Sequence, residues 1–136
     1  MNIPDTTVNL GIACGLFASA GSHAYLYLHG YQHIPMIGPG FLVLVATFGA
    51  LGVLIAVGGP AWLHLAALVG SAGAVAAFAL SRTTGLFGFG ERGLQPAPHA
   101  LLSLLAELVV VALTMWSLRG IFGVSRPVRT RAAEIR

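Results

Sequence analysis

The stretch GFLVLVATFGALGVLIAV, residues 40–57, decides the fold class because it runs for nearly the thickness of a membrane without a charged side chain. A helix needs about 20 predominantly apolar residues to cross the hydrocarbon core of a bilayer. Hydrophobic residues make up 57% of the chain and charged residues 8%. Soluble domains carry about 25% charged residues, so this composition excludes an ordinary soluble domain and predicts membrane helices.

Three more apolar blocks accompany this stretch, at about residues 7–28, 61–80 and 99–118. Glycine and proline gather at 30–39 and 58–60, as is typical of turns. The sequence therefore predicts an all-α, four-helix transmembrane bundle: one four-span domain over residues 1–120, then a basic tail at 121–136. The chain starts without the basic segment of a cleaved signal peptide, so we expect the first helix to stay in the protein.

The arginines predict the orientation. Five of the seven lie near the C-terminus: Arg119, Arg126, Arg129, Arg131 and Arg136. Because positive residues accumulate on the cytoplasmic side, we expect both the N- and C-termini in the cytoplasm, with four spans between them. The loops 30–39 and 81–98 then face outside, where Arg82 and Arg92 are exceptions to the rule.

Small residues form a ladder in the first block. Gly11, Gly15, Ser19 and His23 recur every four residues, which places them on one face of a helix. Small faces let membrane helices approach each other closely. The ladder therefore predicts a tightly packed bundle whose contact face ends in a histidine.

Polar groups converge on the outer half of the predicted bundle. With a rise of 1.5 Å per residue, His23 lies roughly 8–9 Å below the outer surface, and Glu107, on a helix running the other way, roughly 12 Å below it. Ser103, Glu107 and Thr114 share a helix face that should look inward. Ionisable residues inside a span are costly and mark functional sites by default. We expect a buried contact of Glu107 with His23 or with Arg82.

This cluster has three interpretations. The first is a site for copper, iron or zinc, because imidazole and carboxylate groups are common ligands of these metals. Its candidate ligands are His23, His33, Glu91, His99 and Glu107. The second is haem held by His23 and His99, which is disfavoured because His99 lies too close to the surface. The third is a structural network of buried polar residues, Arg82, Ser103 and Glu107, with a His23–Glu107 hydrogen bond that locks the bundle.

The third loop contains SRTTGLFGFGE, residues 81–91. Its glycines permit tight backbone turns, and its aromatic residues are apolar enough to fold back towards the membrane. Irregular backbone at that depth must be covered by protein or water. The pattern predicts either a loop that caps the outer mouth of the bundle or an amphipathic loop on the membrane surface.

Two motifs resemble those of a group of small bacterial four-helix integral membrane proteins. The motifs are IPMIGPGF at 34–41 and GLFGFGE at 85–91, and the pattern of the group is IPxIGPxF followed by GLFGFxE. The resemblance covers most of residues 20–118. The matching positions are His23, Ile34, Pro35, Ile37, Gly38, Pro39, Phe41, Gly85 to Phe89, Glu91 and Glu107. The resemblance implies a four-helix fold and a shared polar cluster, and it implies no reaction.

Three functions follow as hypotheses. The favoured one is a non-catalytic accessory or structural subunit of a larger membrane complex, such as a redox enzyme, embedded in lipid and bound to other subunits or to a second copy. The alternatives are a metal-binding membrane protein and a small proton- or cation-coupled transporter that uses Glu107. We expect no catalytic activity of its own, since phosphate-loop, dinucleotide and EF-hand motifs are absent. We also expect no nucleic-acid binding, because the positive charge lies in a short tail.

Overall fold

The computed structural model describes residues 3–122, and they form four long helices. These are α1 (Ile3–Leu28), α2 (Ile37–Ala56), α3 (Trp62–Arg82) and α4 (His99–Phe122), with a short 3-10 helix, η1 (Tyr31–His33), between the first two. No β-strand forms within this part of the chain, where an isolated antiparallel bridge joins Leu86 and Phe89. The all-α prediction is confirmed. The predictions made for the tail from 123 onwards, including its four arginines, lie outside the described residues.

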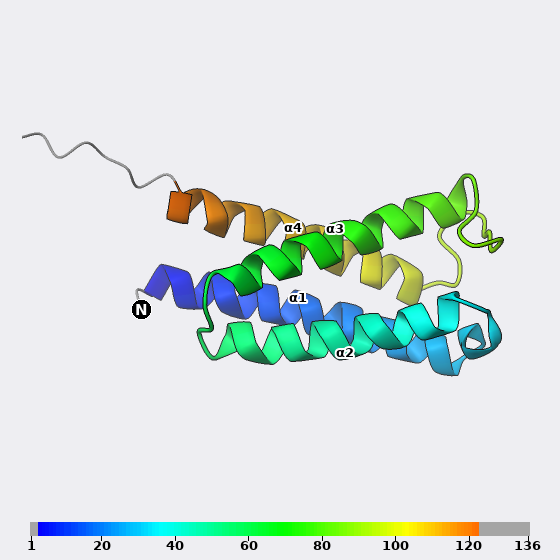
Figure 1. Cartoon of the computed structure of the whole chain (residues 1–136), viewed down its shortest axis with the longest axis horizontal. Coiled ribbons are helices and arrows are strands. Elements are labelled where there is room, and N and C mark those ends of the chain that lie inside the picture. The colour runs from blue at the N-terminus through cyan, green and yellow to red at the C-terminus, as the bar shows by residue number, and fades with distance from the viewer. Residues whose placement is uncertain (1–2, 123–136) are drawn as a thin grey trace, which may run out of the picture.

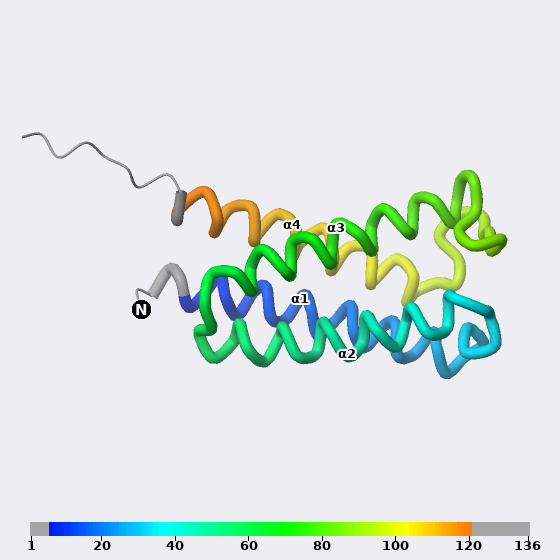
Figure 2. The backbone as a smooth tube through the Cα atoms, in the orientation of Figure 1, coloured from blue at the N-terminus to red at the C-terminus, as the bar shows by residue number. Residues whose placement is uncertain are grey.

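The helices run alternately up and down along one long axis (Figures 1 and 2). Helix α1 packs against both α2 and α4, and α3 packs mainly against α4. The connections 29–36 and 83–98 lie together at one end of the bundle, which we call the loop end. The α2–α3 connection, the start of α1 and the end of α4 lie at the other end, which we call the turn end.

Helices α2, α3 and α4 are long and apolar enough to cross a membrane. Large apolar side chains point outward from the bundle: Val43 is 63% exposed, Val69 64% and Trp116 72%. Helix α1, with 26 residues, is longer but more polar, and four of its polar side chains are buried against its neighbours, whereas Thr7 and Tyr25 are exposed. The buried polar residues of α1 are Asn9, Ser19, Ser22 and His23. This arrangement of polar groups inside and apolar groups outside is typical of helices surrounded by lipid.

The small-residue ladder of α1 packs against α4, as its close-packing role predicts. A Cβ atom added to Gly11 would lie 3.0 Å from Cδ1 of Leu113. One added to Gly15 would lie 2.6 Å from Cγ2 of Val110 and 3.3 Å from the Ala106 carbonyl oxygen. The two helices therefore approach so closely that a methyl group at position 15 would force the Val110 side chain to shift.

An apolar layer separates two sets of buried polar groups. Ile12, Leu16, Phe48 and Val110, each 0% exposed, form this layer within the hydrophobic core. On its turn-end side, His64 Nε2 donates to Asn9 Oδ1 at 2.9 Å and joins α3 to α1. On its loop-end side lie the groups that the sequence singles out.

Candidate functional site

His23 and Glu107 meet inside the bundle, as the depth argument predicts. Helix α1 supplies His23, which is 6% exposed, and α4 supplies Glu107, which is 2% exposed. The His23 Nε2 atom lies 3.8 Å from Oε1 of Glu107. Ser19, one turn before His23, donates its hydroxyl hydrogen to the same Oε1 atom at 2.8 Å. We call these three residues the buried triad.

The backbone of α1 fixes the tautomer of His23. The Nδ1 atom lies 2.9 Å from the Ser19 carbonyl oxygen. Because a carbonyl oxygen only accepts hydrogen bonds, Nδ1 carries the hydrogen, and Nε2 of the neutral ring is an acceptor that faces Glu107. The separation of 3.8 Å exceeds hydrogen-bond length, so a small approach or one bridging water is needed to connect the two groups.

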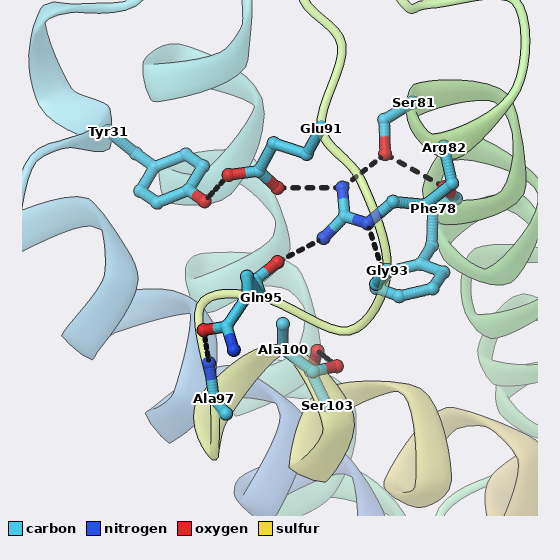
Figure 3. Close-up of polar contacts among 10 residues, drawn as sticks. All are labelled: Tyr31, Phe78, Ser81, Arg82, Glu91, Gly93, Gln95, Ala97, Ala100 and Ser103. Atoms are coloured by element: carbon cyan, nitrogen blue, oxygen red, sulfur yellow. Dashed lines mark hydrogen bonds and ion pairs between the residues drawn. The ribbon is translucent and has the colours of Figure 1, made fainter.

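Arg82 binds the loop between α3 and α4 and not Glu107, so the predicted Arg82–Glu107 alternative is wrong. Its Nη1 atom lies 2.7 Å from Oε2 of Glu91. Its Nε donates to the Gly93 carbonyl at 2.8 Å and its Nη2 to the Gln95 carbonyl at 2.6 Å (Figure 3). The physical reason is position: Arg82 is the last residue of α3, so it meets the loop before it can reach the interior.

Tyr31 completes this second polar cluster. Its hydroxyl donates to Oε1 of Glu91, the carboxylate that Arg82 also holds (Figure 3). Burial raises the pKa of Tyr31, and the hydrogen bond to Glu91 raises it further. Tyr31 therefore remains a neutral hydrogen-bond donor at physiological pH. We call Tyr31, Arg82 and Glu91 the loop clamp.

The 83–98 loop caps the bundle, which confirms the capping alternative. Leu86 and Phe89 pack against Leu26, Tyr31 and Ile37 from the α1–α2 side. Between them, Leu86 and Phe89 exchange two backbone hydrogen bonds of 2.7 and 2.9 Å. The two intervening residues have positive φ, 51° at Phe87 and 80° at Gly88, as a two-residue hairpin turn of type I′ requires.

A cavity of about 80 Å³ lies beneath the cap. The loop clamp lines it at the loop end, and His23, Ser103 and Glu107 line it deeper in the bundle. The other walls are mainly apolar and include Phe41, Leu44, Ala74, Phe78, Leu86 and Phe89. A buried water needs about 10–15 Å³ of such space, so the cavity has room for a few waters or one very small molecule.

The structure does not bring the five predicted metal ligands together. His23 lies beside Glu107, whereas Glu91 belongs to the loop clamp. His33 is exposed on η1, and the His99 ring stacks on Tyr25 with centroids 3.7 Å apart. Among residues 3–122, no three or more histidine, cysteine, aspartate or glutamate side chains form a group that could hold a metal ion. We therefore assign none of the five as a metal ligand.

The predicted buried polar residues have different environments. Ser103 is 4% exposed and donates to the Ala100 carbonyl one turn earlier, at 3.1 Å. Thr114 is fully buried, so the predicted inward face of α4 is confirmed. Sequence reasoning treated Ser19 as a packing residue and missed its bond to Glu107. The signal was available, since Ser19 lies one turn from His23 and at nearly the depth of Glu107.

The fold and the site are compatible with a small helical membrane protein. No family model, curated protein or solved structure gives a significant match to this chain. The function must therefore be argued from the chain's own geometry.

Proposed function

We propose that the chain is a four-span integral membrane protein of a bacterial inner membrane, with both ends in the cytoplasm. Helix α1, with 26 residues, is long enough to span a bilayer, and its most polar interior residues, Asn9, Ser19 and His23, turn inward, away from lipid. Arg119, exposed in the last turn of α4, then lies at the cytoplasmic boundary. The loop end, with its cap and cavity, faces the outside.

Within this frame, the function that we propose is proton binding and exchange at the buried triad, as part of a small proton-coupled transport protein. The observation that carries the proposal is that Glu107, almost fully buried, lines a cavity and faces the acceptor nitrogen of His23. A carboxylate and an imidazole at this separation can hold one proton between them once a small approach or a bridging water connects them. We place the proton on Glu107 in the resting pair, as a carboxylic acid, from which it can pass to His23 Nε2.

The electrostatics favour a proton as the bound ion. With one proton, the pair is either carboxylic acid and imidazole or carboxylate and imidazolium, and its net charge is zero in both forms. Without the proton, a lone carboxylate remains inside the membrane, which is costly. Release of the proton is therefore tied to a compensating event, such as hydration of the cavity or the arrival of another cation. This obligatory link is the physical basis of proton-coupled transport.

Infrared difference spectroscopy of the protein reconstituted in liposomes tests this function. We expect a carbonyl band of a protonated carboxylic acid that shifts when H₂O is replaced by D₂O. The band should be lost in Glu107→Gln and retained in Glu91→Gln. A pH gradient across the liposome should then drive a proton flux that Glu107→Gln abolishes. Absence of the exchangeable band from the unaltered protein contradicts the proposal.

A second candidate function, the non-catalytic accessory subunit, is favoured by one outward face of α3. Ala72, Gly73 and Ala76 are exposed there, and a Cβ atom added to Gly73 would meet nothing within 4 Å. Small outward faces allow another membrane helix to pack closely. The larger membrane complex, redox or otherwise, would dock on this face.

Co-purification in mild detergent tests the subunit function. A partner should elute at a fixed ratio, and Gly73→Leu should release it. Gly21→Leu is the matched control, because Gly21 is another exposed glycine with nothing within 4 Å of an added Cβ atom, but on α1. If the chain elutes alone under detergent conditions that keep other membrane complexes intact, the result contradicts this role.

A further inference from the structure

The cavity joins two carboxylates that differ sharply in their contact with water. Glu91, in the cap, has 23% of its side chain exposed, whereas the side chain of Glu107 is 3% exposed. Both line the same cavity, Glu91 at the loop end and Glu107 deeper in the bundle. Glu91 is therefore the described carboxylate that faces both the outside solution and the interior space.

We infer that Glu91 is a proton-relay residue through which protons pass, along waters in the cavity, between the outside solution and the buried triad. The inference rests on the proposed function and adds a second site to it. A hydronium ion outside gives a proton to Oε1 of Glu91, where the Tyr31 hydroxyl turns from donor to acceptor, and the O–H bond formed there replaces the one broken in solution. Glu91 then gives a proton to a cavity water, which passes one on to Glu107 or His23. One positive charge moves inward, and nothing is oxidised or reduced.

The other groups that face the cavity are less suited to this role. Helix α2 contributes the apolar side chains Ile37, Phe41 and Leu44. From α3, the Arg82 guanidinium only donates hydrogen bonds and has no acceptor atom to receive a proton. From η1, Tyr31 also keeps its proton, because burial and Glu91 raise its pKa. The remaining titratable groups, His23 of α1 and Glu107 of α4, are the buried acceptors themselves.

Arg82 is a positioning residue in this scheme. Its three loop contacts fix Glu91, Gly93 and Gln95 over the cavity, and its Nη1 also donates to Ser81 Oγ at 2.8 Å. Loss of the guanidinium releases the cap and opens the cavity to solution. Loss of the Glu91 acid leaves the cap closed but without a relay. The two changes therefore have opposite effects on the rate at which Glu107 exchanges its proton.

The test measures the exchange rate of the Glu107 carboxylic-acid proton by time-resolved infrared spectroscopy after mixing with D₂O. Glu91→Gln keeps the size of the side chain and one acceptor oxygen but removes the acid and the negative charge, and we expect it to slow exchange on the order of 10²-fold, the lower range for a positioned proton-transfer group. Arg82→Gln should accelerate exchange. Arg92→Gln is the matched control, since Arg92 is an exposed arginine of the same loop, and it should leave the rate unchanged.

A rescue variant separates acid chemistry from the shape of the cap. Glu91→Asp retains a carboxylic acid and should recover part of the rate lost in Glu91→Gln. Exchange at the unaltered rate in Glu91→Gln, or equal slowing in Glu91→Asp and Glu91→Gln, overturns the relay while leaving proton binding at Glu107 intact. Absence of an exchangeable Glu107 band from the unaltered protein overturns both proposals. Thermal melts of each variant establish that the compared proteins are folded.

Discussion

Tyr31 and Glu91 share a hydrogen bond that joins the two long connections at the loop end of the bundle. Tyr31 belongs to η1, between α1 and α2, and Glu91 belongs to the loop between α3 and α4. Arg82 holds the other oxygen of the same carboxylate. The bond thus connects the two helical hairpins, α1–α2 and α3–α4, at the loop end of the bundle.

The hydrogen bond between Tyr31 and Glu91 predicts that the Tyr31 phenol loses its proton late in an alkaline titration. Tyr31 should ionise at a higher pH than free tyrosine, as measured by ultraviolet absorbance, and Tyr31→Phe should remove that late phase. Because the folded-state pKa is raised, the contribution of Tyr31 to stability is complete below about pH 10 and is lost as the pH rises further. Glu91→Gln should move the late phase towards lower pH. If Glu91→Gln leaves the pH of the Tyr31 ionisation unchanged, the result contradicts Glu91 as the hydrogen-bond partner of Tyr31.

The Ser19–Glu107 hydrogen bond should contribute measurably to stability. Ser19→Ala leaves a buried carboxyl oxygen without its donor, and we expect a loss of about 1–3 kcal/mol in the free energy of unfolding in detergent. Ser103→Ala is the matched control, because this buried serine bonds only within its own helix, to the Ala100 carbonyl. Equal losses of unfolding free energy in the two variants would show that the Ser19–Glu107 bond stabilises the protein no more than a hydrogen bond within one helix.

The α1–α4 contact should be intolerant of a methyl group at Gly15. An added Cβ atom would lie 2.6 Å from Val110 Cγ2, so Gly15→Ala should lower the free energy of unfolding by about 1–3 kcal/mol through overpacking. Gly21→Ala, on the same helix but in open space, should be neutral or stabilising by up to about 1 kcal/mol. Comparable thermal stability of the two variants would argue against the close approach.

Cysteine labelling in intact cells should establish the orientation. In a Cys14→Ala background, Thr84→Cys lies in the cap loop and Ala61→Cys in the α2–α3 connection, and both positions are exposed. We expect a membrane-impermeant maleimide to label Thr84→Cys directly and Ala61→Cys only after the cells are opened. The reverse pattern would invert the proposed topology, and labelling of both from outside would exclude a four-span arrangement.

Much of the helical architecture could be predicted from the sequence, because long apolar blocks and glycine–proline breaks carry strong local signals. The meeting of His23 and Glu107 was also predictable. Two residues on antiparallel helices at similar depth have few other places to lie once both must avoid lipid. The ladder through Gly15 likewise identified the face of α1 that packs closely, though not that its neighbour is α4.

The loop clamp could not be predicted in the same way. Glu91 and Arg82 lie in or beside an irregular loop, where no periodicity relates residue spacing to direction, so Glu91 was grouped with metal ligands and Arg82 with Glu107. Their pairing depends on the turn at Phe87 and Gly88, which reverses the chain and returns Glu91 to α3. Glu91 N also donates to the Ser81 carbonyl at 2.9 Å, a contact with no signature in sequence.

The apolar layer of Ile12, Leu16, Phe48 and Val110 has an electrical consequence for the groups on either side of it. Packed hydrocarbon polarises far less than water, so in an energised membrane the voltage falls mainly across such a layer. Moving one elementary charge through the whole potential changes its energy by about 2.3 kcal/mol per 100 mV. His23 and Glu107 lie on the loop-end side of the layer, and His64 lies on its turn-end side. In the proposed transmembrane arrangement, the voltage therefore acts chiefly on a charge that moves from one side of this layer to the other.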